Sequence, residues 1–369
     1  MVSILIVIVL IVAVPVLATI VFMKQPSFGR RPSGARLERI QHSPQYRKGS
    51  FHNQSLTPQL TGGVSMFTVI RDFFFGRHER KRPAEALPVI KRDLCQPVSD
   101  VPQLTWFGHS SYLLQVNGLN ILVDPVFSQR TSPVQYAGSK AFAGVSIYTV
   151  ADLPDIDILL LTHDHYDHLD YNSVRLLKDK VAMVITSLGV GAHLEYWGIP
   201  AGKIRELDWW EATQIKEGTS FTATPSRHFS GRGFKRNQTL WSSFVLETGA
   251  WRFYLCGDSG YDTHFKMIGE RFGPFDLAIL EDGQYNPYWA NIHMMPEETA
   301  QAAVDLNARV LFPVHWGKFA LATHAWDDSI RRVLERSETL GVKVITPQIG
   351  ELVLLDGRFI GRRWWEGLA

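Results

Sequence analysis

The residues best suited to chemistry lie together in the segment 162–170, which reads Thr-His-Asp-His-Tyr-Asp-His-Leu-Asp. Two histidines stand two positions apart, and an aspartate and a third histidine follow as neighbours. Zinc prefers imidazole nitrogens and carboxylate oxygens, and a catalytic zinc site keeps a coordination position open for water. A loop can fold so that His163 and His165 face one metal ion while Asp167 and His168 face another. The segment therefore predicts a catalytic metal site.

Two metal ions need more ligands than this one loop provides. Three later residues have suitable side chains and each follows a strand-like run: His228 after residues 221–224, Asp258 after residues 251–255, and His315 after residues 310–314. Side chains at strand ends that gather along one edge of a sheet converge on a pocket. We therefore expect these three residues to lie near the histidine cluster.

The elements that must position these residues form a mixed pattern. Residues 156–161 are a short apolar run, typical of a buried strand, and deliver the cluster at its end. The runs 103–116 and 119–123 are joined by Asn117-Gly118, the dipeptide that a tight hairpin prefers. Further strands are expected at 182–185, 221–224, 241–247, 251–255, 277–280 and 310–314, and helices from near residue 172, at 296–306 and at 329–340. Hairpins mixed with helices favour two mixed β-sheets flanked by helices over one doubly wound parallel sheet.

Length and composition agree with one large domain. Of 369 residues, 45% are hydrophobic and 20% are charged, which suits a domain over residues 101–369 with an N-terminal extension. The net charge of +2 gives no general reason to expect a nucleic-acid partner. Cys95 and Cys256 lie outside any CxxC pattern, so we expect two free thiols.

The N-terminus predicts contact with a membrane. Residues 2–23 carry no charge and as a helix would span roughly 33 Å, so residues 1–23 are expected to form a single-pass transmembrane anchor rather than a cleaved signal peptide. Basic residues dominate the beginning of the arm 24–100, which places the hydrolase domain on the cytoplasmic face. A second basic stretch follows Phe73, Phe74 and Phe75, and indicates either contact with anionic lipid or an ordinary solvated turn.

The order of the ligands resembles that of a known family. The series His-x-His-x-Asp-His, followed by separate His, Asp and His residues, is similar to the ligand series of the metallo-β-lactamase superfamily, which implies an αββα sandwich. More narrowly, the region from about Pro102 to about His324 resembles N-acyl-phosphatidylethanolamine-hydrolysing phospholipase D. The motifs that carry this resemblance include Trp106-Phe107-Gly108-His109, Asp124-Pro125-Val126-Phe127, Glu206-Leu207-Asp208-Trp209-Trp210, Arg271-Phe272-Gly273-Pro274-Phe275-Asp276 and His315-Trp316-Gly317.

This resemblance implies a role for each site residue. It assigns His163, His165 and His228 to one zinc ion, Asp167, His168 and His315 to a second, and Asp258 to a bridge between them, so that each chain holds two Zn²⁺ ions. It names Asp167 and His293 as catalytic residues, His293 lying in the stretch His-Met-Met-Pro-Glu-Glu. Ile292 and the long apolar N-terminus depart from the pattern of the animal enzymes. We interpret His109, Asp124 and Asp208 as groups that support the ligands.

The implied reaction is phosphodiester hydrolysis at a membrane, which releases N-acylethanolamine and phosphatidic acid from a phospholipid. Zinc-activated water is the expected nucleophile, and a homodimer is left open. Two alternatives of different classes stand beside this reading: a lactonase or other hydrolase of small phosphorylated metabolites, and a metal-free, membrane-tethered binding protein. Iron in place of zinc is disfavoured by the ligand types without being excluded. The aromatic residues Tyr285, Tyr288 and Trp289 favour a long apolar cleft for a lipid.

Overall fold

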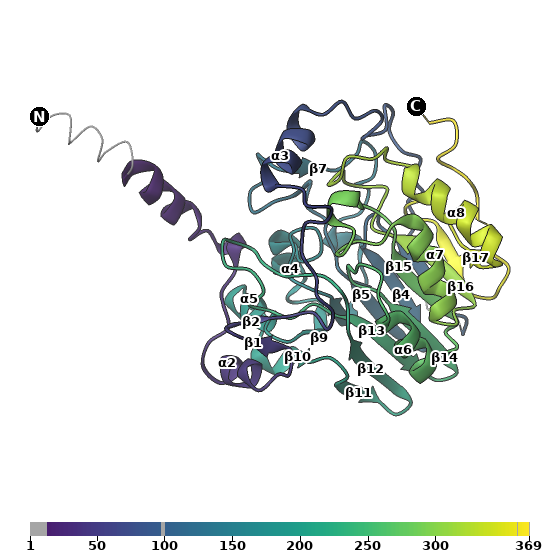
Figure 1. The fold of residues 1–369 in the computed structure, drawn as a ribbon. Helices are drawn as coiled ribbons and strands as arrows, with labels where there is room; N and C mark the ends of the chain where they lie inside the picture. Colours follow the sequence, from purple (N-terminus) through teal and green to yellow (C-terminus); the bar gives the residue numbers. More distant parts are fainter. Residues whose placement is uncertain (1–12, 97–99, 360, 369) are drawn as a thin grey trace, which may run out of the picture.

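The computed structural model describes residues 13–96, 100–359 and 361–368. Its body is built on two seven-stranded sheets (Figure 1). The first sheet has the order β10-β9-β8-β5-β4-β3-β18, with bounds Ile204–Leu207, Val181–Ser187, Ile156–Leu161, Leu119–Val123, Tyr112–Val116, Gln103–Trp106 and Leu352–Leu354. The second has the order β11-β12-β13-β14-β15-β16-β17, with bounds Ala212–Lys216, Thr219–Thr224, Ser243–Thr248, Trp251–Leu255, Leu277–Glu281, Val310–Val314 and Lys343–Val344.

Both sheets are mixed, and each changes from antiparallel to parallel pairing within the sheet. In the first sheet β4 and β5 pair antiparallel whereas β5, β8 and β9 pair parallel; in the second, β13 and β14 pair antiparallel whereas β14, β15 and β16 pair parallel. Helices flank the sandwich (Figure 1). They are α4 (Tyr171–Leu177), α5 (Gly191–Tyr196), α6 (His264–Phe272), α7 (Pro296–Asp305) and α8 (Asp328–Leu340). The predicted αββα arrangement is confirmed.

Alternating side chains explain why the first sheet is buried on both faces. In β4, Leu114 joins the large core cluster between the sheets, while its neighbour Leu113 joins a second cluster. That second cluster also contains Val174 of α4 and Leu194 of α5. Because successive side chains of a strand point to opposite faces, a strand with apolar residues on both faces must be covered on both.

The predicted hairpin is present, with one difference. Val116 pairs with Leu119, and Asn117 and Gly118 both take positive φ, as a tight two-residue turn requires. The run 103–116, however, is not one strand. It is interrupted between β3 and β4, where Gly108 and His109 also take positive φ. This turn brings His109 into the interior, where its side chain is fully buried.

The predicted transmembrane anchor is wrong. Within the described part of the chain, no helix combines the length and the apolar character needed to cross a bilayer. Residues 13–22 are helical. Residues 1–12 of the predicted anchor lie outside the described residues. The assignment of the hydrolase domain to the cytoplasmic face depended on this anchor and is withdrawn with it.

The basic arm contains regular structure and lies against the body. It carries α2 (Gly34–Gln41), α3 (Met66–Phe75) and the small pair β1 (Tyr46–Arg47) and β2 (Ser50–Phe51). One of its arginines finds partners on the hydrolase domain: Arg36 pairs with Glu206 at 2.7 Å and also contacts Glu195. Part of the arm's positive charge is therefore matched by the protein itself. The division of the chain at residues 23 and 100 stays a prediction.

Candidate metal centre

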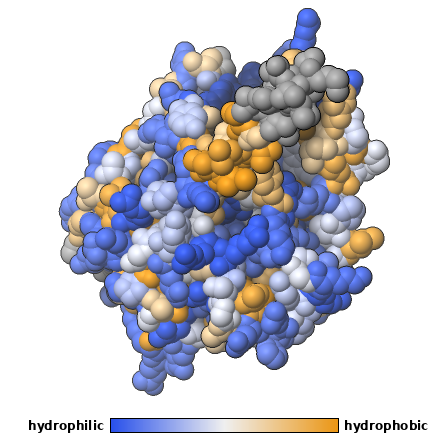
Figure 2. Space-filling view, turned by 90° about the vertical axis from the view of Figure 1, so that its left-hand side faces the viewer, coloured by the Kyte–Doolittle hydropathy of each residue, from blue (hydrophilic) through white to orange (hydrophobic). Residues whose placement is uncertain are grey.

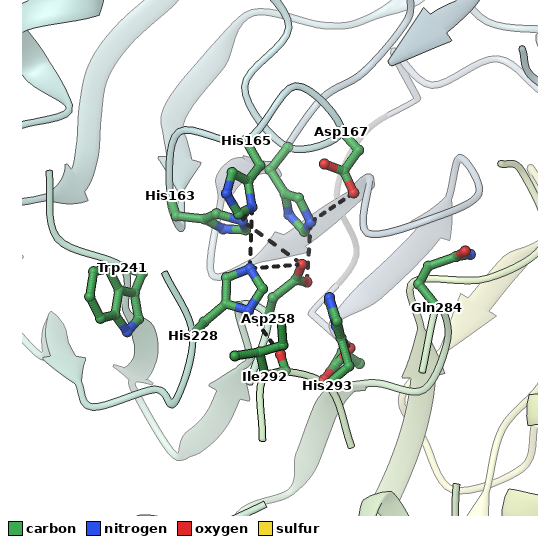
Figure 3. Close-up of polar contacts among 12 residues, drawn as sticks. His163, His165, Asp167, His228, Trp241, Asp258, Gln284, Ile292 and His293 are labelled. Carbon is green, nitrogen blue, oxygen red and sulfur yellow. Dashed lines mark hydrogen bonds and ion pairs between the residues drawn. The ribbon is translucent and has the colours of Figure 1, made fainter. Parts of the chain in front are cut away.

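The seven predicted ligands lie together between the edges of the two sheets, although they come from four separate segments (Figure 3). The loop after β8 carries His163, His165, Asp167 and His168, and each of the other three follows a strand: His228 after β12, Asp258 after β14 and His315 after β16. Strand ends thus bring residues far apart in sequence to one place, as the sequence predicts. That these side chains bind a metal stays a prediction.

The first group consists of His163, His165, His228 and Asp258, whose ligand atoms all lie within 4.8 Å of one another. His165 Nδ1 lies 3.0 Å from His163 Nε2 and 3.2 Å from His228 Nε2. Asp258 Oδ2 lies 3.8 Å from His163 Nε2. Three imidazole nitrogens and one carboxylate oxygen therefore face a common point.

The second group consists of Asp167, His168 and His315. His168 Nε2 lies 3.4 Å from His315 Nε2, which in turn lies 3.3 Å from Asp167 Oδ2. Asp258 also reaches this group, because its Oδ1 lies 3.1 Å from His168 Nε2. Asp258 is thus the carboxylate between the two groups, at the place where the resemblance implies a bridge.

The donor geometry of both groups fits a divalent metal. Tetrahedral zinc with bonds of about 2.0–2.1 Å to nitrogen would separate its ligand nitrogens by about 3.3–3.4 Å, close to the distances observed. In two of the rings, the nitrogen that faces outward is occupied by a protein acceptor. His228 Nδ1 lies 2.8 Å from the Ile292 carbonyl oxygen, and His163 Nδ1 lies 3.0 Å from Thr162 Oγ1. This leaves Nε2 of both rings directed at the centre, as metal-binding histidines require.

Burial and charge divide the histidines into two kinds. Burial, helped by neighbouring imidazoles, holds the pKa of His163 and His228 well below the usual range, so these rings are neutral and can act as ligands. Burial also opposes a proton on His315, but the carboxylates of Asp258 and Asp167 outweigh it and raise its pKa to about 10. A metal ion at this ring competes with a proton, so metal affinity there rises with pH.

Two of the three predicted supporting residues contact the ligands. Asp124 is buried and its Oδ2 lies 2.7 Å from His168 Nδ1. His109 Nε2 donates to Asp167 Oδ2 at 2.9 Å, and burial, followed by the neighbouring His315, lowers the pKa of His109 to about 3. Asp208 is different: it accepts from the backbone N–H of Trp209 and shapes a turn away from the ligands.

Sequence reasoning did not identify Glu281, the last residue of β15. Its buried carboxylate contacts two rings of the site at once: Oε2 lies 2.9 Å from His293 Nδ1 and 3.3 Å from His315 Nδ1. Oε1 accepts from the backbone N–H of Met294 at 2.9 Å, which fixes the loop that carries His293. The sequence does contain a signal for this residue, because it is an acid at the end of an apolar run. A similar pattern pointed to the later ligands.

A cavity of about 260 Å³ opens over both groups and is largely apolar. His293 lines it and stacks on His315, with ring centroids 5.4 Å apart. Ile292 and Gln284 lie beside it (Figure 3). The arm supplies one wall, which the sequence did not predict. The arm residues in this wall are Gln59, Leu60, Met66 and Val69.

Comparison with known proteins agrees with this geometry. The family model described as the Beta-lactamase superfamily domain matches residues 119–316. A protein of Mycobacterium tuberculosis described as uncharacterized is 39% identical over 88% of this chain and 88% of its own length. An N-acyl-phosphatidylethanolamine-hydrolyzing phospholipase D of Caenorhabditis elegans is 32% identical over 67% of this chain and 74% of its own length.

Solved structures show the same fold. A metallo hydrolase from the archaeon Ignicoccus hospitalis superimposes with a TM-score of 0.53 at 22% identity, covering 69% of this chain and 97% of the archaeal one. All seven predicted ligands lie within the residues 119–316 that the family model matches. The chain belongs to the β-lactamase superfamily, as a metal-dependent hydrolase of the metallo-β-lactamase fold.

Proposed function

We propose that this protein is a phosphodiesterase that uses two zinc ions to cleave N-acylated ethanolamine phospholipids, releasing N-acylethanolamine and phosphatidic acid. The observation that carries the proposal is the cavity, because it joins two metal groups to an apolar wall. Two neighbouring metal ions can bind the oxygens of a phosphate diester, and the apolar wall of the cavity can pack against an acyl chain. The name of the Caenorhabditis elegans relative supports the same substrate class.

The chain's own residues mainly hold the metal ions and orient the substrate. The two groups would bind the ions through the seven residues described above. Two divalent ions bound there would supply Lewis acidity that activates water and neutralises charge on the phosphoryl oxygens. The wall excludes water from the acyl chain, and Arg236, which also lines the cavity and donates to Gln59 at 2.8 Å, offers a positive charge to an anionic substrate.

His293 is positioned to give a proton to the leaving alcohol. Glu281 accepts from its Nδ1, so Nε2 faces the cavity (Figure 3). The test is the dependence on the leaving group. For His293→Ala we expect a loss of about 100-fold with the N-acylethanolamine ester but little loss with a p-nitrophenyl diester, whose leaving group needs no proton. Equal losses with both substrates would remove the proton-donor role.

Helix α3 is suited to contact lipid beside the cavity. Met66 and Val69 line the cavity, while Phe67 is 74% exposed and Phe75 is 82% exposed. Exposed apolar side chains gathered in this way mark interaction surfaces. We expect Phe67→Ser to raise the KM for vesicle substrate several-fold and to leave short-chain soluble substrate unchanged. Leu176→Ser, at an exposed apolar residue of α4, is the matched control; an equal effect of both would speak against a role for α3.

The reaction itself is tested with purified protein whose metal content has been measured by elemental analysis. We expect about two zinc ions per chain and release of N-acylethanolamine that falls at least about 1000-fold in His165→Ala. His42→Ala is the control, because the ring of this exposed histidine bonds to the Glu38 carbonyl of its own helix. Zinc-loaded protein that cleaves lactones but no phosphodiester would overturn the substrate, and folded protein without bound metal would overturn the mechanism.

A further inference from the structure

A second cavity lies away from the catalytic one, between the N-terminal segment and the hydrolase domain. It has a volume of about 360 Å³ and is lined by residues 19–32 on one side and by the loop 231–239 on the other. It shares no lining residue with the catalytic cavity among the residues that the structure describes. Its inner wall includes Asp164, which lies between two predicted metal ligands.

The charges that line this cavity favour an anion. Lys24, Arg31 and Lys235 are exposed, and no ion pair joins them to any described residue. Asp164 is the one acid among the described lining residues, and it is buried and already satisfied. It accepts from the Gly231 backbone N–H at 2.7 Å and from Thr239 Oγ1 at 3.0 Å. The cavity therefore presents three unmatched positive charges.

The fourth cation of the cavity, Arg232, is already committed to the fold. Its guanidinium is buried and donates to the carbonyl oxygens of Ser27 at 2.7 Å, Asp164 at 2.7 Å and Leu169 at 2.8 Å. It also lies over the Tyr166 ring, 4.0 Å from the centroid. Arg232 thus fastens the N-terminal segment to the metal loop, and the three other cations are left for a ligand.

Apolar side chains adjoin these charges. Ile20 and Met23 line the cavity from the N-terminal segment, and Phe234 lines it from the opposite loop while remaining 84% exposed. Figure 2 shows an apolar patch on the face from which the N-terminal helix projects. An exposed phenylalanine beside unmatched cations suits a ligand that has both an anionic head and an apolar tail.

We propose that this cavity binds an amphiphile with a phosphate monoester head, with the phosphate near Lys24, Arg31 and Lys235 and the alkyl chain against Ile20 and Phe234. Such a ligand touches both the N-terminal segment and the loop 231–239, so it holds the two together. Its binding does not require the catalytic reaction, so this site could exist whether or not the proposed function is correct.

The test uses cleavage by trypsin after Lys24 in the full-length protein as purified. The probe is dodecyl phosphate below its micellar concentration, and a Kd is obtained from the dependence of the cleavage rate on its concentration. We expect saturating probe to slow this cleavage at least about 5-fold. Arg31→Met/Lys235→Met should raise the Kd about 10-fold, as the loss of two exposed ion pairs would give. Lys178→Met, at an exposed lysine outside the cavity, should not change the Kd.

Comparison probes identify the chemistry that is recognised. Dodecyl maltoside has the same tail without charge, and inorganic phosphate has the same charge without a tail; neither should protect at the concentrations at which dodecyl phosphate does. Equal protection by dodecyl maltoside would indicate a detergent effect, and equal protection by inorganic phosphate would indicate a site for free phosphate. Either result would contradict a site for an anionic amphiphile. Absence of protection, or an unchanged Kd in the double variant with native circular dichroism, would overturn the site.

Discussion

Replacing Asp124 by asparagine tests whether the metal centre depends on one hydrogen-bonded carboxylate behind it. Asp124 Oδ1 accepts from the Thr162 backbone N–H at 2.9 Å, and Oδ2 lies 2.6 Å from Thr162 Oγ1 and 2.7 Å from His168 Nδ1. An asparagine has nearly the same shape but must place an NH₂ group at one of these positions. If the amide oxygen stays with the backbone N–H, the NH₂ group faces His168 Nδ1, which can then only accept.

The consequence is a change of tautomer at a predicted ligand. With Nδ1 accepting, the single proton of the His168 ring in its neutral, metal-binding form lies on Nε2, the atom that faces His315 across 3.4 Å. A protonated Nε2 cannot bind a metal ion. The opposite orientation of the introduced amide leaves two donors facing each other in a buried site, which costs about 1–3 kcal/mol. Either way we expect zinc affinity to fall about 10- to 100-fold, or about 1.4–2.7 kcal/mol.

The assay is competition for zinc with a chromophoric chelator, at equal protein concentration and fixed pH. Asp157→Asn is the matched control, because Asp157 of β8 also accepts from a backbone N–H of a neighbouring strand, that of Asn120 at 2.8 Å, but contacts none of the ligands. We expect the control to bind zinc within about twofold of the wild type. Wild-type affinity in folded Asp124→Asn protein would refute the reasoning about the tautomer.

Three further predictions concern the thiols, a buried lysine and the metal. Burial raises the pKa of the Cys256 thiol to about 12, so a thiol reagent should modify only Cys95 in native protein and both after denaturation; two fast thiols in native protein would contradict this. Burial lowers the pKa of Lys318 to about 8, below its ordinary 10.5, so the folded state binds fewer protons than the unfolded state between these values and stability rises with pH there. The unfolding free energy of the wild type relative to Lys318→Met should therefore increase by about 1 kcal/mol from pH 7.5 to pH 9, as urea titrations would show. Removal of metal by a chelator should lower the Tm by about 10 °C and restored zinc should recover it, because two ions, each at about 1000 times its Kd, together contribute about 8 kcal/mol.

Much of the fold was predictable from local patterns. The apolar run before His163 is β8, and the Asn117-Gly118 turn joins β4 to β5, because both signals are read within a few residues. The interruption between β3 and β4 was not predictable in the same way. Residues 107–111 continue a strand-like run in the sequence, but the chain turns there at Gly108 and His109, which both take positive φ, and this turn brings His109 to Asp167.

The site residues that could be predicted are those with a ligand-type side chain just after a strand. The residues that were missed come from segments far away in the sequence. The side chains of His228, Asp258 and His315 could be found because each follows a strand-like run. The arm wall could not, because Met66 of α3 lies about a hundred residues before the metal loop and its helix shows nothing in sequence that points to a cavity. Packing between distant segments produces no periodic pattern of apolar residues within either segment.

The positions of the two buried acids explain why neither sheet could form the centre alone. Asp124 follows β5 of the first sheet and supports His168, whereas Glu281 ends β15 of the second sheet and contacts both His315 and His293. Each sheet therefore supplies predicted ligands together with a carboxylate that contacts them. Because Asp258 touches ligands of both groups, a shift of one sheet against the other would open both groups at once. Substitutions in the core between the sheets should consequently reduce metal affinity before they unfold the domain, which distinguishes this centre from one built within a single loop.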